Sequence, residues 1–186
     1  SLGIADEVSS QYLATSNIFA IPPIFKSASS FSEGLAGAKK EGDKNSGFID
    51  STGEFVIAPN PERTYHTPFS EGLAGFSINN KGGYIDKTGK IAIEPQFVDF
   101  TLGKFKEGLA AVQIEYEGKR GYIDKKGDLV AEVKFGNAGD FIDGLALVTV
   151  EGKWGYIDKS GEFAIEPQNY YATDFSEGRA RIKIDQ

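Results

Sequence analysis

"FSEGLA" at residues 69–74 decides the fold, because close copies of this string recur along the whole chain. The shared pattern is phenylalanine, any residue, an acid, glycine, any residue and alanine, and it begins at Phe31, Phe69, Phe105, Phe141 and Phe175. Successive copies are therefore 38, 36, 36 and 34 residues apart. Such a period is typical of repeat proteins, in which each unit buries its apolar surface against its neighbours.

A second string recurs between the copies of the first and completes the repeat. It reads "GFID" or "GYID" and begins at Gly47, Gly83, Gly121 and Gly155. Each copy is followed by two residues, a glycine and then an apolar run. This order predicts strand, turn, strand, turn, strand and loop, so we expect each repeat to form a three-stranded antiparallel meander.

The strand that follows each acid–glycine pair shows the alternation of a half-buried strand. In the second copy, Ala74, Phe76 and Ile78 lie on one face, because successive side chains of a strand point to opposite sides. We expect this apolar face to form the core. The other face begins with Leu73 and then becomes small or polar, so we expect it to be less buried.

The turns and strand ends have their own sequence signals. An aspartate separated by two residues from a glycine occurs at Asp50, Asp86, Asp124 and Asp158, which predicts a turn whose glycine has positive φ. Prolines close the third strand in most copies, at Pro23, Pro59, Pro95 and Pro167. Because proline cannot donate to a ladder, we expect it to end that strand.

The repeats predict an all-β array of about four to five units. We expect an open, curved stack, with a closed propeller-like ring as the alternative, because the array opens on a lone third strand and closes on a lone first strand. Residues 18–186 are predicted to form a single β-repeat domain. Residues 1–17 are predicted to be an N-terminal cap segment, in which Ile4, Val8 and Tyr12 have the spacing of a short helix.

Composition excludes several classes of function. The chain has 20 basic and 27 acidic residues, so its net charge of −7 argues against binding nucleic acid or an anionic membrane surface. No apolar run reaches the roughly 20 residues of a membrane-spanning helix. Cysteine is absent, and no nucleophile elbow or glycine-rich phosphate loop occurs. We therefore expect neither an enzyme nor a cofactor.

Two rows of acids are the strongest chemical candidates. The first row is Glu33, Glu71, Glu107, Asp143 and Glu177, and the second consists of the four turn aspartates. Stacked repeats could align either row to hold calcium, since carboxylate oxygens are preferred calcium ligands. The alternative, which we favour, is that each acid caps its own turn and no metal binds.

Aromatic residues also recur at fixed places, namely the five phenylalanines and the row of Phe48, Tyr84, Tyr122 and Tyr156. Their repetition favours core packing over sugar stacking. Binding specificity is more often found where repeats differ, and the loops "NPERTYHTP", "YEGKR" and "QNYYATD" differ most. The predicted ligand-binding residues are Tyr65, His66, Tyr116, Arg120, Trp154, Tyr170 and Tyr171.

The fullest copy, "EGKWGYIDKSGEFAIEP" at residues 151–167 with "FSEG" from Phe175, resembles the bacterial WG-repeat (KWG-repeat) family. The resemblance extends over about residues 18–184. The naming tryptophan occurs only at Trp154, and its slot holds Ser46, Gly82 and Arg120 in the other copies. The resemblance implies a β-rich bacterial module that is secreted or associated with the cell envelope, with no assigned catalytic residues; a cytoplasmic location is the alternative.

These observations predict a non-catalytic module that binds a protein or a cell-surface polymer such as a polysaccharide. Two other functions remain open. The chain is alternatively a structural spacer or accessory domain that displays a separate functional domain, and the third possibility is a calcium-binding repeat array.

Overall fold

The computed structural model describes residues 24–115, 118–168, 170–173, 179–180 and 182–184. The described residues form β-strands and one short 3₁₀ helix, η1 (Asp99–Thr101). All strand pairs are antiparallel, and they are grouped into successive sheets along the chain. The predicted cap segment 1–17 and its short helix lie outside the described residues.

The first two sheets have four strands each, in sequence order. The first sheet contains β1 (Phe25–Ala28), β2 (Ala36–Lys40), β3 (Gly47–Ile49) and β4 (Phe55–Ile57). The second sheet contains β5 (Thr64–Tyr65), β6 (Leu73–Ile78), β7 (Lys81–Asp86) and β8 (Ile91–Val98).

The remaining sheets continue the series toward the C-terminus. The third contains β9 (Ala110–Gln113), β10 (Arg120–Ile123) and β11 (Leu129–Phe135). The fourth contains β12 (Ala138–Ile142), β13 (Leu145–Val150), β14 (Lys153–Asp158) and β15 (Phe163–Gln168). The last pair is β16 (Tyr170–Ala172) and β17 (Ile182–Ile184).

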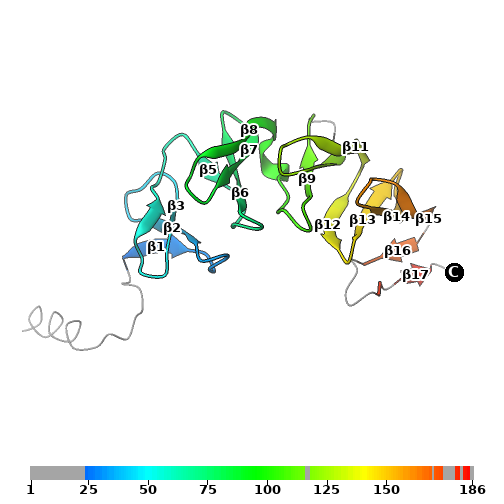
Figure 1. Cartoon of the computed structure of the whole chain (residues 1–186), viewed down its shortest axis with the longest axis horizontal. Helices are drawn as coiled ribbons and strands as arrows, with labels where there is room; N and C mark the ends of the chain where they lie inside the picture. The colour runs from blue at the N-terminus through cyan, green and yellow to red at the C-terminus, as the bar shows by residue number, and fades with distance from the viewer. Residues whose placement is uncertain (1–23, 116–117, 169, 174–178, 181, 185–186) are drawn as a thin grey trace, which may run out of the picture.

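The sheets stack side by side into an open arch, with β1 and β17 at opposite ends (Figure 1). The prediction of an open, curved, all-β array is therefore confirmed, and the alternative of a closed ring is not. Three sheets contain one strand more than the predicted meander, because the linker before the repeated phenylalanine also pairs. In the second sheet this pairing joins Tyr65 to Phe76.

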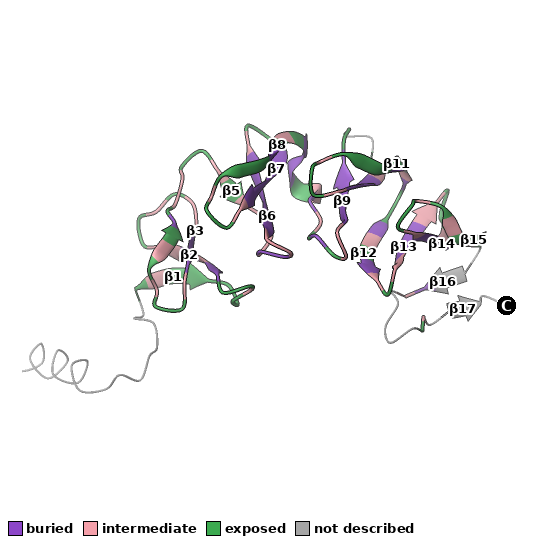
Figure 2. Ribbon diagram, in the orientation of Figure 1, coloured by how far each residue is buried: buried purple, intermediate pink, exposed green. Residues whose placement is uncertain are grey.

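Both faces of the inner strands are buried (Figure 2). The predicted core face is confirmed, since Ala74 and Phe76 are fully buried. The opposite face is also buried at Leu73 and Ser77, contrary to expectation. The reason is that an inner sheet packs between two neighbours, so it needs an apolar or well-satisfied surface on each side. We call the contacts between successive sheets junctions and number them in chain order. The first junction lies between the first and second sheets, and the fourth lies between the fourth sheet and the β16–β17 pair.

The prolines do not end the third strands in the second and fourth sheets. Pro95 lies within β8 and Pro167 within β15, and each strand shows register shifts against its partner near the proline. The expectation was wrong because β8 and β15 are edge strands with a single partner, so a bulge accommodates the missing donor. The bulge of β8 lies close to Gly83, since a Cβ added there would be 2.5 Å from the Ile93 carbonyl oxygen.

Candidate functional site

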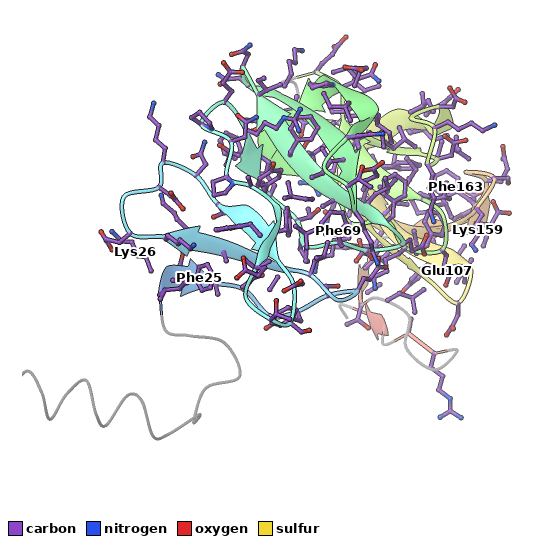
Figure 3. The ribbon with its side chains drawn as sticks, turned by 60° about the vertical axis from the view of Figure 1, so that its left-hand side comes forward. Phe25, Lys26, Phe69, Glu107, Lys159 and Phe163 are labelled. Atoms are coloured by element: carbon purple, nitrogen blue, oxygen red, sulfur yellow. The ribbon has the colours of Figure 1, made fainter. Side chains whose placement is uncertain are left out.

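The first acid row joins neighbouring repeats. The backbone N–H of Gly108, in the turn of the next repeat, donates to Oε2 of Glu71 (3.0 Å), and Lys125 Nζ approaches the same oxygen (3.1 Å). Glu107 is placed in the same way by Gly144 and Lys159, which are contributed by the following repeat (Figure 3). These glutamates therefore fasten one repeat to the next.

This arrangement corrects the expectation that each acid caps its own turn. Glu33, Glu71 and Glu107 have φ of 53°, 53° and 51°, and each precedes a glycine that also has positive φ. Such a pair forms a tight two-residue hairpin, in which asparagine or aspartate commonly precedes glycine. Glutamate is an uncommon residue for positive φ. Its longer side chain, however, reaches the turn of the next repeat.

The second acid row behaves as predicted. Oδ1 of Asp86 accepts hydrogen bonds from the backbone N–H groups of Thr88 (2.8 Å) and Lys90 (3.1 Å), within its own turn. Gly89, which closes this turn, has φ of 82°. Asp50, Asp124 and Asp158 repeat this arrangement. No group of three or more His, Cys, Asp or Glu side chains that could hold a metal occurs among the described residues.

The junction glutamates predict a loss of stability in acid. Burial acts to raise the pKa of Glu71, but hydrogen bonds from Lys125 and Gly108 lower it below its ordinary value of 4.5. A carboxyl with a lowered folded pKa stabilises the fold above its unfolded pKa, and this contribution is lost as pH falls through the folded value. We expect a variant with Glu33, Glu71 and Glu107 changed to Gln to unfold with a weaker dependence on pH below about 4.5.

Urea unfolding at pH 7 and at pH 3 measures this difference. Each partly exposed pair is expected to contribute less than about 1 kcal/mol. The matched control changes three exposed glutamates to Gln, namely Glu41, Glu132 and Glu162, which alters the net charge equally. An identical pH dependence in the two variants would contradict the role of the junction glutamates.

The described members of the aromatic rows pack between repeats, as predicted, except for Phe31, which is 45% exposed. The ring centroids of Tyr84 and Phe105 lie 4.9 Å apart, and both side chains are fully buried. The hydroxyl of Tyr84 donates to the carbonyl oxygen of Gly103 in the linker to the next repeat (2.9 Å). Tyr122 and Tyr156 make the equivalent bonds at 2.7 Å. These hydroxyls satisfy one linker carbonyl at each of the three later junctions.

The first junction lacks this hydroxyl, because Phe48 occupies the tyrosine position. Its ring lies 4.8 Å from that of Phe69, so it is placed like Tyr84 against Phe105. The carbonyl oxygen equivalent to that of Gly103 belongs to Thr67, and it accepts no hydrogen bond from the described residues. The first junction therefore presents a linker acceptor for which the described part of the chain provides no donor.

The junctions also differ in a space beside the aromatic rings, which is bounded by two positions on the sheet and one in the linker and which we call the slot. At the second junction the linker residue Leu102 fills the slot above Gly75 and Gly82. A Cβ added to Gly82 would lie 2.9 Å from a Leu102 methyl carbon, and one on Gly75 would lie 3.2 Å away. The two glycines are therefore required for the leucine to enter.

At the third and fourth junctions, large and small side chains are placed differently among the same three positions. At the third junction the positions hold Ala111, Arg120 and Ala138. At the fourth they hold Leu147, Trp154 and Ala172, which pack together. A small linker residue thus accompanies larger residues on the sheet, and a large linker residue accompanies glycines. We expect such compensation between the sizes of linker and sheet side chains, because protein interiors are packed to a nearly constant density.

At the first junction the three positions hold Gly37, Ser46 and His66, and the slot is not filled. The imidazole Nε2 of His66 lies 2.7 Å from the Ser77 hydroxyl, in its own sheet. The result is a cleft of about 410 Å³ at this junction. Phe48, Tyr65 and His66 line it together with several hydroxyl-bearing side chains.

A smaller cleft of about 220 Å³ adjoins the same histidine. Its lining includes Ser77, buried Asp99 and Phe100, whose side chain is 84% exposed. The rings of His66 and Phe100 are 5.6 Å apart between centroids. Burial lowers the pKa of His66, with the Asp99 carboxylate acting in the opposite direction, so the imidazole is neutral at pH 7.

The predicted ligand-binding residues do not form one site. Tyr65 and His66 line the cleft at the first junction. Arg120 begins β10 and Trp154 lies half-buried in β14, so they belong to the third and fourth junctions. Tyr170 and Tyr171 are backbone members of β16, and their side chains are not described. Tyr116 lies outside the described residues.

Sequence reasoning missed Ser46, Phe48 and Thr67 as cleft residues. Ser46 was read only as a missing tryptophan, and Phe48 only as a member of an aromatic row. Phe48 is the one phenylalanine at a position that is otherwise tyrosine, and this difference is visible in the sequence. Its consequence depends on the Thr67 carbonyl, which is 19 residues away and is brought near only by folding.

Comparison with protein families gives a match over nearly the whole chain. A family model described as "WG containing repeat" matches residues 17–43, 47–81, 83–117, 121–154 and 154–186. No curated protein matches the chain. No helix among the described residues is long and apolar enough to cross a membrane.

Among solved structures, the chain is similar to a protein of unknown function from Bacteroides caccae, known from a crystal structure. The sequence identity is 14% and the TM-score is 0.40. The alignment covers 75% of this chain and 59% of that protein, so the chain spans less than two thirds of the length of the structure it matches.

Proposed function

This chain belongs to the WG-repeat family, and we propose that it is a non-catalytic binding module whose ligand site is the cleft at the first junction. The cleft carries the proposal, because it arises where the chain departs from its own repeat at Ser46, Phe48 and His66. In repeat proteins, differences between repeats commonly define the binding face.

The repeated residues support a scaffold role for the rest of the array. The glutamates and tyrosines that recur in three repeats each bond to the neighbouring unit, so they are engaged in holding the junctions. Because a pocket with a few convergent polar groups is the usual form of a ligand site, the cleft is the better candidate. We propose a protein or a cell-surface polymer as its ligand, and a secreted or envelope-associated location.

Filling the cleft tests this proposal. Ser46→Trp places at the first junction the side chain that Trp154 supplies at the fourth, and we expect it to abolish binding. The matched control is Ser51→Trp, on an exposed turn, which adds the same bulk away from the cleft. Binding is measured on arrays of glycans and peptides. If Ser46→Trp binds as the unchanged chain does, the ligand site is elsewhere.

A structural spacer is the second candidate, and the fastening of the junctions favours it. Glu33, Glu71 and Glu107 link consecutive repeats in an unbroken series, which suits a stiff arch. A spacer predicts that the chain binds nothing on either array. The calcium-binding alternative is disfavoured, because each junction carboxylate already contacts a lysine ammonium, at 2.8–3.1 Å.

A further inference from the structure

Thr67, at the cleft of the first junction, has a backbone carbonyl that accepts no hydrogen bond within the described part of the chain. At the other three junctions a tyrosine hydroxyl donates to the linker carbonyl, at 2.7–2.9 Å. At the first junction Thr67 is one of the residues that line the cleft, and Phe48 has no hydroxyl to donate to the Thr67 carbonyl oxygen. A polar group that loses its partner costs free energy unless water or a ligand replaces that partner. The missing group is a hydroxyl.

We infer that this cleft binds one sugar unit of a neutral polysaccharide, with a sugar hydroxyl donating to the Thr67 carbonyl oxygen in place of the absent tyrosine hydroxyl. The inference rests on the proposed binding function and names its ligand class. It commits to a carbohydrate, and a peptide ligand is an outcome of the test.

The lining of the cleft fits a sugar ring in its polar character. Ser27, Ser30 and Ser46 contribute hydroxyls, which can both donate and accept, whereas the Ser29 hydroxyl already donates to the Ser30 carbonyl and accepts from the Gly37 N–H. A sugar hydroxyl has the same dual capacity, so it can pair with such groups in either sense. The cleft volume of about 410 Å³ lies in the range of small-ligand pockets.

The apolar part of the lining fits the C–H face of the same ring. Half-buried Tyr65 and Pro68 supply this apolar surface, because Phe48, whose ring centroid lies 5.0 Å from that of Tyr65, is only 2% exposed. Among the described residues, no Asp, Glu, Lys or Arg lines the cleft, and burial lowers the pKa of His66, which favours its neutral form at pH 7. An acidic or basic sugar would therefore find no partner charge, so the geometry points to a neutral one.

An extended peptide fits the same surface less well. A peptide that adds to a sheet needs a row of free backbone N–H and C=O groups along an edge strand. Two edge strands border the cleft: β5 has only two residues, Thr64 and Tyr65, and β1 has four, of which Ser27 and Ala28 line the cleft. Such short strands limit main-chain pairing with a peptide, whereas the side-chain hydroxyls of the lining suit a sugar.

Restoring the missing hydroxyl is the sharpest test. In Phe48→Tyr we expect the new hydroxyl to reach the Thr67 carbonyl, because the Phe48 ring is placed like Tyr84. The probes are cellotriose, maltotriose, xylotriose, mannotriose and chitotriose, titrated into the full chain and followed by NMR shifts of the His66 and Thr67 amides. At least one is expected to bind, and Phe48→Tyr is expected to weaken it tenfold or more.

Tyr84→Phe is the matched control, because it removes a hydroxyl from the second junction, where Leu102 still fills the slot. We expect sugar binding within twofold of the unchanged chain. Ser46→Trp serves as a second blocking variant should Phe48→Tyr fail to fold. Equal affinity in the unchanged chain and in the folded blocking variant would overturn the site.

The remaining outcomes separate this inference from the proposed function. Binding of a peptide pool without binding of any trisaccharide would overturn the sugar assignment and leave the binding module in place. Binding of neither class would overturn both and favour the spacer. Binding that requires a charged trisaccharide, tested with an alginate trimer, would overturn the neutral character of the ligand.

Discussion

Phe105→Ala is expected to lower the free energy of unfolding by about 3–5 kcal/mol, the usual cost of deleting a buried phenylalanine. The Phe105 side chain is fully buried at the second junction. It packs against Tyr84, and the same cluster contains Leu102 and Ile123 from different repeats. Its removal therefore leaves a cavity between sheets, which neither sheet can close alone.

Phe31→Ala is the matched control for this prediction, because Phe31 occupies the same motif position in the first repeat. Its side chain is 45% exposed, so less apolar surface returns to water and little cavity forms. We expect a loss of less than about 1 kcal/mol, within the range of ordinary surface substitutions. Urea unfolding followed by tyrosine and tryptophan fluorescence measures both. Similar losses at the two positions would refute the packing of the junctions.

Gly83→Ala is expected to cost about 3 kcal/mol, at the upper end of the range for overpacking. The added methyl carbon would lie 2.5 Å from the Ile93 carbonyl oxygen and 2.9 Å from the Pro95 nitrogen. Both are backbone atoms of the bulged strand β8, so no side-chain rotation relieves the contact. The strand must shift, and hydrogen bonds between β7 and β8 are lost.

Gly37→Ala provides the control, since Gly37 also lies in a strand but has space beside it. The nearest heavy atom to an added Cβ is the Ser29 hydroxyl oxygen, at 3.4 Å. We expect a change within about 1 kcal/mol of zero, because alanine also restricts the unfolded chain. The comparison uses midpoints of thermal unfolding. If Gly83→Ala lowers the midpoint of thermal unfolding as little as Gly37→Ala does, the bulge of β8 does not pack closely against Gly83.

The glycine of "GYID" illustrates what a local sequence pattern can and cannot predict about the structure. Its recurrence marked a strand in the sequence, but the reason for glycine lies in the neighbouring strand. Pro95 was expected to end β8, because the sequence shows only that a donor is missing. Whether a strand ends or bulges there depends on its partners, and β8 has only β7 beside it.

The two acid rows differ in how well their contacts could be predicted from the sequence, again because one contact is local and the other depends on a neighbouring repeat. Asp86 caps its own turn, and a contact over two to four residues can be deduced from spacing alone. Glu71 bonds to Gly108, which lies 37 residues further along the chain. Its role depends on how one repeat sits on the next, so the sequence did not distinguish the two rows.

The sequence by itself determined the repeat period, the strand and turn order, the apolar strand face and the burial of the aromatic residues that lie between described repeats, but not the exposure of Phe31. These properties follow from side-chain alternation and turn preferences, which act over a few residues. Tertiary structure decided between the open arch, which the sequence favoured, and the closed ring. It alone decided that Glu71 fastens the next repeat and that the pairing of the Thr67 carbonyl depends on Phe48. Each of these depends on the packing of repeats against one another, where a missing hydroxyl or an unfilled slot has a consequence only in the presence of its distant partner.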